Sequence, residues 1–393
     1  MMSTTIIITI CSLLLLAYIF DISSPFTKIP SVILLLILGG VVKQITILLH
    51  FNIPDLNPIL PVLGNIGLIL VVLEASLELE INRTKLRVIR KSFLISFIPM
   101  VILAFTIAYI FYYFGLASFK NALLNAIPFC VISSTIAISS TNGLQSQFKE
   151  FIIYESSLSD ILGILFFNFI ILNDNINLLS FGNFTLQILI ITVVSFVSVL
   201  GLSFLLSRIK HHVTYSPIIL LVVLIYMLSK ILHLPGLIFI LVFGLFLGNF
   251  NDIKHYKWFD KFHPEKLVIE VNKFKGITSE ATFLIKSLFF LLFGFLMDIK
   301  EIINLITLPW AGVIVFLIII IRFITLRISN LPSSPLLFIA PRGLITILLF
   351  LAIEPEHSTK LVNNSLIIQT IILSVIAMMI GLLLNKENKE NIE

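Results

Sequence analysis

Long apolar runs follow one another along almost the whole chain and leave little room for any other kind of fold. They lie at about 4–20, 29–46, 58–77, 92–114, 120–140, 150–172, 182–207, 216–233, 236–249, 278–298, 308–327, 335–354 and 364–384. A transmembrane helix needs about 20 predominantly apolar residues, and most of these runs approach that length. The sequence therefore predicts an all-α, polytopic membrane protein with about thirteen transmembrane helices.

The composition excludes a water-soluble enzyme. Only 12% of the 393 residues are charged and 58% are hydrophobic, whereas soluble domains carry about 25% charged residues. Cys11 and Cys130 both lie in apolar runs, which argues against a disulfide framework or a metal cluster. The net charge of +5 is explained by cationic loops, so no nucleic-acid partner is predicted and membrane lipid is the expected surrounding.

The basic residues are divided unevenly between the two sides of this series of runs. Eighteen of the 26 Lys and Arg residues fall in one set of alternating loops and in the C-terminal tail, and five fall in the other set. Cytoplasmic loops carry the excess of Lys and Arg, so we expect the N-terminus outside and the C-terminus in the cytoplasm. The prediction is a single transmembrane domain at 1–385 in the inner (plasma) membrane, followed by a cytoplasmic tail at 386–393.

Two of the runs are interrupted by a proline at corresponding places. Pro128 lies within 120–140 and Pro341 within 335–354, and each is followed four and five residues later by Ile and then by Ser or Thr. A proline inside a helix removes one backbone hydrogen bond and clashes with the preceding turn. Broken helices in two halves of a chain mark the binding site of inverted-repeat transporters. The simpler alternative is a pair of kinked helices in a large bundle.

Three acidic residues lie within the predicted spans: Glu74 in 58–77, and Glu155 and Asp160 in 150–172. A charged side chain at the bilayer centre costs roughly 2.5–3.5 kcal/mol even on insertion scales. Glu155 and Asp160 are five residues apart, which is about 500° of helical rotation, or roughly 140° net, so they cannot form one tight pair. We expect one acid to be neutralised by a buried base and the other to be free for a cation or a proton.

Three basic residues also lie within the predicted spans: Lys286, Arg322 and Arg342. Arginine stays charged at any accessible pH, so it must be paired when it is buried. Arg322 is therefore the first candidate partner for Glu155, and Lys286 is the second. The alternative for Lys286 and Arg322 is that the long side chain reaches out to the membrane surface.

Several hydroxyl side chains are available to Asp160, and they predict an oxygen-only site for a monovalent cation or a proton. They are Ser133, Ser134, Thr135, Ser156 and Ser159. No resident cofactor is needed for such a site. The alternative is a hydroxyl-rich helix interface with one satisfied acid. Glu74 is either an outer ligand that acts through water or an acid at a helix end.

Four segments carry a further indication. Residues 155–160 read Glu-Ser-Ser-Leu-Ser-Asp, 133–135 read Ser-Ser-Thr, 340–344 read Ala-Pro-Arg-Gly-Leu, and 291–298 read Leu-Leu-Phe-Gly-Phe-Leu-Met-Asp. In this order they resemble the Glu-Ser-x-x-Asn-Asp, Thr-Asp-Pro, Arg-Gly and Phe-x-x-x-Gly segments of the monovalent cation:proton antiporters, the sodium/proton exchanger superfamily. The resemblance covers nearly the whole chain, and the order and spacing of the segments together make it specific.

This resemblance implies a homodimer built from two kinds of domain. A core domain at about 92–172 and 308–384 would slide in an elevator-like motion. It would move against a dimerisation or scaffold domain at about 1–77 and 182–249. A cytoplasmic linker would occupy 250–277.

The resemblance also implies roles for individual residues. Asp160 would carry the cation and the proton in turn, Glu155 would pair with Arg322, and the expected exchange is electroneutral. Ser159 stands in place of the family's Asn and Ser134 in place of its acid. These two departures bear on the choice between Na⁺, K⁺ and Li⁺, of which Na⁺ is the first expectation.

Two other functions fit parts of the pattern. A sodium-coupled carrier of an organic anion uses a similar inverted-repeat fold, and Arg342 beside a helix break is the one indication of the cationic pocket that it needs. An intramembrane enzyme would use Glu155 and Asp160 as acid and base. Their angular separation argues against it, as does the location of all seven histidines in loops or at helix ends. The sequence therefore predicts an antiporter and not an enzyme.

Overall fold

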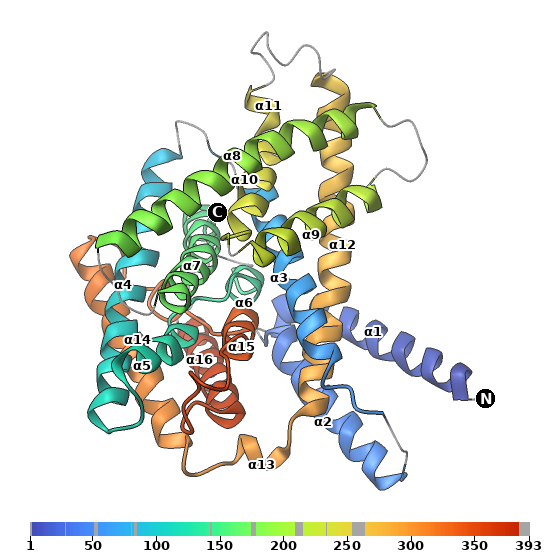
Figure 1. Cartoon of the computed structure of the whole chain (residues 1–393). Helices are drawn as coiled ribbons and strands as arrows, with labels where there is room; N and C mark the ends of the chain where they lie inside the picture. Colours follow the sequence, from blue (N-terminus) through green and yellow to red (C-terminus); the bar gives the residue numbers. More distant parts are fainter. Residues whose placement is uncertain are drawn as a thin grey trace, which may run out of the picture. The chain divides into compact units, whose positions relative to one another are not determined.

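The computed structural model describes most of the chain, and all of the regular structure in its described part is helical (Figure 1). The described residues are 2–27, 29–50, 54–79, 81, 85–141, 144–173, 178–208, 215–232, 234–253 and 264–384. The tail predicted at 386–393 lies outside these ranges.

Every predicted apolar run contains a helix. In chain order the helices are α1 (Met2–Thr27), α2 (Ser31–Leu48), α3 (Ile59–Glu78), α4 (Leu86–Tyr113), α5 (Phe119–Ala126), the 3₁₀ helix η1 (Ile127–Phe129), α6 (Ser134–Ser139), α7 (Ser146–Leu172), α8 (Leu178–Arg208), α9 (Tyr215–Ile231), α10 (Leu237–Gly248), α11 (Phe250–Ile253), α12 (Pro264–Leu296), α13 (Ile299–Ile302), α14 (Leu308–Ile328), α15 (Leu344–Leu351) and α16 (Asn364–Leu384). Ten helical stretches are long and apolar enough to cross a membrane, counting α5, η1 and α6 as one. The predicted all-α, polytopic membrane fold is confirmed.

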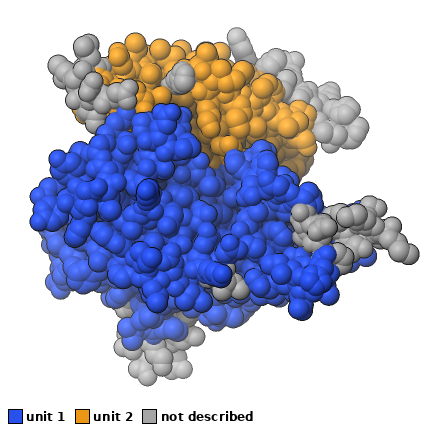
Figure 2. All heavy atoms as spheres, turned by 60° about the horizontal axis from the view of Figure 1, so that its bottom comes forward, with its two compact units in different colours: residues 1–64, 91–163, 286–393 blue, residues 65–90, 164–285 orange. Residues whose placement is uncertain are grey.

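The chain divides into two compact units (Figure 2). Unit 1 comprises residues 1–64, 91–163 and 286–393, and unit 2 comprises 65–90 and 164–285. Both interrupted helices and both residues of the acidic pair in α7 belong to unit 1. The division into a mobile core and a dimerisation domain stays a prediction.

The first interrupted helix breaks where Pro128 predicts it. Helix α5 ends at Ala126, η1 contains the proline, and residues 130–133 are not helical before α6 begins at Ser134. Non-helical backbone is tolerated at membrane depth only where the protein satisfies its polar groups. Here the Ile132 N–H donates to the Ser159 hydroxyl at 2.9 Å, so a side chain of α7 stabilises the break.

The second interruption lies at 335–343, where residues predicted as the first half of a span are not helical and α15 begins only at Leu344. Its backbone is joined to the first break, because the Ser133 N–H donates to the Pro341 carbonyl at 2.9 Å. The Arg342 N–H donates to the Ser374 hydroxyl of α16 at 3.0 Å. The two breaks therefore meet within unit 1, as in transporters with crossed broken helices.

Helices α2 and α12 approach so closely that only glycine fits between them. A Cβ on Gly39 would overlap the backbone of Leu291, and a Cβ on Gly294 would overlap that of Leu36. Gly294 is the glycine of the Phe-x-x-x-Gly segment, so in unit 1 this glycine allows α12 to pack closely against α2.

Lys43 also links α2 to the end of α12. Lys43 lies in α2, and its ammonium donates to the Met297 carbonyl at 2.9 Å and to the Asp298 carboxylate just beyond α12. A cation at the C-terminal end of a helix is favourable for the helix dipole. The hydrogen bond and charge of Lys43 hold the pKa of the Asp298 carboxyl below its usual value.

In unit 2, α10 packs on α3 through glycines. A Cβ on Gly244 would overlap the Ser76 side chain, and the Asn249 side chain donates to the Leu79 carbonyl at 2.8 Å. This contact explains how α10, with only 12 residues, is held although its run is short for a span.

Helix α12 begins at Pro264, well before the predicted span at 278–298. Residues 264–277 of the predicted linker are therefore the first turns of this helix, and 254–263 lie outside the described residues. Proline is favoured at the first helical position, and charged residues end the apolar part of a helix without ending the helix. The predicted apolar run therefore marks the later part of α12, and the helix extends back into the predicted linker.

Candidate functional site

Asp160 lies in the middle of α7, where its side chain is only 3% exposed. One carboxylate oxygen, Oδ2, accepts a hydrogen bond from the Ser134 hydroxyl at the start of α6. The other oxygen, Oδ1, has no hydrogen-bond partner within the part of the chain that the structure describes. Most buried polar groups are paired, so this buried carboxylate has an oxygen available for a cation or a proton.

The break in the first interrupted helix places Ser134 against Asp160. Because the chain leaves helical geometry after η1 and resumes at Ser134, this hydroxyl lies at the first turn of α6, where it reaches α7. Ser134 stands where the related motif has an acid, so a neutral donor replaces a second negative charge. One carboxylate and one hydroxyl therefore form the centre of the site.

The other predicted hydroxyl ligands have partners of their own. The Ser133 and Thr135 hydroxyls bond to each other at 3.0 Å, and Ser156 donates to the Ile152 carbonyl at 2.7 Å. Ser159 accepts the Ile132 N–H, so it supports the break. A hydroxyl oxygen carries two lone pairs, so these residues keep capacity as ligands, but of the five only Ser134 bonds to Asp160.

Four other hydroxyls are also buried without a hydrogen-bond partner among the described residues: Ser157, Thr278, Ser287 and Thr346. Thr346 is the counterpart of Ser133 in the proline repeat, being five residues after Pro341.

Glu155 and Arg322 form a bidentate ion pair in the interior of unit 1. Arg322 Nη1 and Nη2 donate to the two Glu155 carboxylate oxygens at 2.5 and 2.9 Å, and Nε donates to the Leu336 carbonyl at 2.8 Å. The two residues are 1% and 3% exposed. Paired geometry of this kind is strong and specific. Both oxygens of Glu155 are thereby occupied by Arg322 and not by the second candidate, Lys286.

Arg342 is a second fully buried cation, and its partners are backbone carbonyls. Its Nε donates to Phe129 at the end of η1 at 2.5 Å, and its Nη1 donates to Ala340 at 2.8 Å. Both carbonyls lie at the helix breaks, and that of Phe129 is at the C-terminal end of η1, where a helix carries partial negative charge. Arg342 therefore fastens the breaks together and is engaged there, which weakens it as the anion-binding group of the rival carrier.

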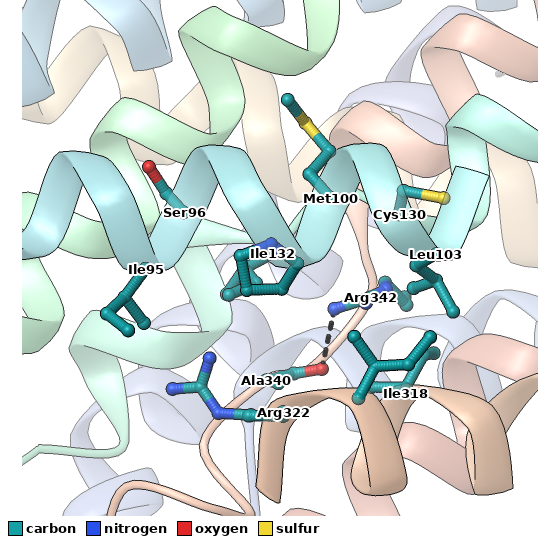
Figure 3. A pocket seen from close by; sticks show the side chains of 12 residues that line it. Ile95, Ser96, Met100, Leu103, Cys130, Ile132, Ile318, Arg322, Ala340 and Arg342 are labelled. Carbon is teal, nitrogen blue, oxygen red and sulfur yellow. Dashed lines mark hydrogen bonds between the residues drawn. The ribbon is translucent and has the colours of Figure 1, made fainter. Parts of the chain in front are cut away.

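A small cavity of about 20 Å³ lies beside the two arginines (Figure 3). Its lining includes Ser96 and Met100 of α4, Cys130 of the first break, and Arg322 and Arg342. This is room for about one water molecule and is too little for an organic anion.

Two further predicted residues lie in α3 and α12. Glu74 lies in the part of α3 that belongs to unit 2, so its role as an outer ligand stays a prediction. Lys286 is half-buried in α12, and its role stays open.

Two broken helices that meet beside a buried carboxylate, within an all-α membrane fold, define a secondary transporter. Residues 11–386 match the family described as sodium/hydrogen exchanger, transmembrane. The chain belongs to this family. Members of the family are transporters, so the enzyme alternative is excluded and the predicted antiporter class is confirmed.

Comparison with solved structures agrees with this fold. Two structures of the sodium proton antiporter MjNhaP1 from Methanocaldococcus jannaschii, one of them at pH 8 and the other from electron microscopy, match at 18% identity with TM-scores of 0.68 and 0.66. The first match covers 98% of this chain and 96% of the other, and the second covers 97% and 95%. No curated protein sequence matches the chain.

Proposed function

We propose that this protein exchanges one monovalent cation, Na⁺ before K⁺ or Li⁺, for one proton, with Asp160 as the shared carrier. The observation that carries this proposal is the buried Asp160 carboxylate with Oδ1 unpartnered among the described residues. Hard cations take oxygen ligands, and the same oxygen takes a proton, so the two substrates compete for one place. The ions are substrates, and no resident cofactor is required.

The neighbouring charges support a ratio of one to one. Glu155 is compensated by Arg322, and Arg342 is held by backbone carbonyls at the two helix breaks. Asp160 is then the acid in this cluster whose charge changes during the cycle. With either a proton or a monovalent cation bound, it crosses the membrane neutral in both directions.

The cost of an empty carboxylate supports obligatory coupling. Carrying an uncompensated charge to the bilayer centre costs roughly 2.5–3.5 kcal/mol, which reduces the crossing of the empty site by about a hundredfold or more. We propose that unit 1 residues around Asp160 move as an elevator-like core only when a proton or cation neutralises this residue. Ser133, Ser134, Thr135, Ser156, Ser159 and Glu74 are proposed as further ligands, some of them through water.

We also propose that the protein is a homodimer in the inner (plasma) membrane, with the N-terminus outside and the C-terminus in the cytoplasm. The uneven distribution of Lys and Arg supports the orientation. Light scattering of the purified protein in detergent measures the dimer, and a monomer at all concentrations would contradict it.

The carrier role is tested by Asp160→Asn. The amide keeps the size of the side chain, but it has no negative charge for a cation and does not take up or release a proton. In everted vesicles loaded with a pH-sensitive dye, adding Na⁺, K⁺ or Li⁺ to the parent should release the proton gradient. Asp160→Asn should abolish this response, while the matched change Asp55→Asn at an exposed position should retain it. Undiminished exchange by Asp160→Asn at equal expression would refute the assignment.

A further inference from the structure

A fully buried amide, Asn125, joins two segments that are far apart in the sequence. Asn125 lies in α5, and its Nδ2 donates to the His357 carbonyl at 2.7 Å and to the Asn121 carbonyl at 2.8 Å. Its Oδ1 accepts the Thr359 N–H at 3.4 Å. We call Asn121, Asn125, His357 and Thr359 the Asn125 clasp. One side chain thus satisfies three backbone groups at 0% exposure.

The clasp connects the first half of one interrupted helix to the segment that follows the other. Asn121 and Asn125 belong to α5, the first half of one interrupted helix (Figure 1). His357 and Thr359 lie in the segment between α15 and α16, just after the other interrupted helix. A side-chain contact runs in parallel, because His357 Nδ1 lies 3.1 Å from Asn121 Oδ1.

The same two helices are also joined at their breaks. Ser133 N–H donates to the Pro341 carbonyl, and Arg342 Nε donates to the Phe129 carbonyl. A Cβ on Gly343 would come within 2.6 Å of the Ser133 hydroxyl oxygen. The half-helix α5 is therefore held at Asn121 and Asn125, and the chain is held again just after α5 at Phe129. These contacts oppose hinging of α5 at the break by itself.

We infer that Asn125 is a positioning residue for exchange: it holds the two interrupted helices as one body, so that the Ser134 hydroxyl at the first break keeps its place against Asp160 while the site moves. This inference rests on the proposed antiport function. Asparagine suits the place because its amide supplies two donors and one acceptor. The Asn125 side chain bonds to backbone groups, so these hydrogen bonds do not depend on the identity of the side chains in the segment between α15 and α16.

The first experiment removes the clasp. Asn125→Ala should raise the KM for Na⁺ about tenfold, the factor that corresponds to about 1.4 kcal/mol, because the hydroxyl ligands at the first break are no longer held in position. Asn125→Asp should have a larger effect, since it places acceptor oxygens against two carbonyls. The matched control is Asn173→Ala, which removes one side-chain bond to the Phe169 carbonyl at the end of α7 and should leave the KM unchanged. A purely structural role would reduce the amount of folded protein but leave the KM of the remainder at the parental value.

The second experiment locks the clasp with a metal. Asn121→His places a second imidazole beside His357, where the present contact is 3.1 Å, and zinc binds imidazole nitrogens at about 2.0–2.1 Å each. Micromolar Zn²⁺ should raise the melting temperature of this variant while its exchange rate stays within about twofold of the parent's. In the double variant Asn121→His/Asn125→Ala, Zn²⁺ should return the KM towards the parental value. The parent with Zn²⁺ is the control.

The results separate the clasp from the antiport function. If the parent moves no protons when Na⁺, K⁺ or Li⁺ is added, the proposed function fails, and with it the inference. If the parent is active but Asn125→Ala has the parental KM, the clasp inference alone is overturned. Arrest of Asn121→His by Zn²⁺ would also overturn it, because the two helix ends would then have to separate during transport. Should Asn125→Ala fail to fold, the zinc lock still decides the question.

Discussion

Two carboxylates five residues apart in α7 have opposite surroundings. Both oxygens of Glu155 accept hydrogen bonds from Arg322, whereas Asp160 shares one oxygen with the neutral Ser134 hydroxyl and keeps the other without a partner among the described residues. Burying a charge costs hydration free energy, and in a buried ion pair the opposite charge offsets that cost. Glu155 is therefore suited to a fixed role, and Asp160 to reversible binding.

Breaking the buried ion pair should destabilise the protein strongly. Glu155→Gln leaves Arg322 buried without a compensating charge, and removing one partner of such a pair costs roughly 3–5 kcal/mol. We expect a large fall in the melting temperature measured in detergent. The double variant Glu155→Gln/Arg322→Met should recover much of the loss, and Glu354→Gln at an exposed position should change little. A parental melting temperature for Glu155→Gln would contradict the structural role of the pair.

At the scale of elements, the interrupted helices depend on donors and acceptors from their neighbours. Ser159 of α7 accepts the Ile132 N–H, which the break leaves without a helical partner. The related motif has Asn at this position, and Asn also offers an acceptor oxygen. Ser159 therefore stabilises the backbone of the break, a role that its prediction as an ion ligand did not include.

Ser159→Ala should destabilise the break. It leaves a buried N–H without an acceptor, at a cost of about 1–3 kcal/mol, so the melting temperature should fall and the KM for Na⁺ should rise. Ser159→Asn should restore both. The matched control is Ser157→Ala in the same helix, whose hydroxyl has no partner within the described residues. Equal effects of the two alanine changes would show that Ser159 does not support the break.

The contact between α2 and α12 is also tested at this scale. Gly294→Ala forces a methyl group against the Leu36 backbone, and overpacking of this kind costs about 1–3 kcal/mol. Gly312→Ala in α14 meets open space and should stabilise its helix by about 0.5–1 kcal/mol. Thermal unfolding of the two variants should therefore shift in opposite directions. A stabilising Gly294→Ala would show that the two helices are not closely packed.

At the scale of the whole molecule, one exchanging carboxylate predicts transport that the membrane potential does not drive. A net charge moved per cycle would change the driving force by about 2.3 kcal/mol for each 100 mV, or about fifty-fold. We expect the final Na⁺ and pH gradients in proteoliposomes to be the same with and without an imposed potential. A shift of the end point with potential would indicate a second charge and refute the one-to-one ratio.

The membrane fold followed from the sequence because it depends on local composition. Apolar runs indicate spans, prolines such as Pro128 and Pro341 indicate breaks, and charges inside runs stand out whatever their surroundings. The pairing of Glu155 with Arg322 was one of two alternatives at the level of residues. The predicted helix bounds were less secure where charged residues lie within a helix, as after Pro264.

What only the tertiary structure decided is how residues far apart in the chain share their hydrogen bonds. Of the five predicted hydroxyls, Ser134 is the one that bonds to Asp160. Ser159 instead accepts a backbone N–H at the first break, and Arg342 bonds to Phe129, 213 residues away. Spacing along one helix fixes which side chains share a face, but it does not determine which other segment lies opposite. The sequence by itself thus determined a membrane antiporter with charged residues inside its spans. Packing decided which acid is neutralised and which has an oxygen available for the ion.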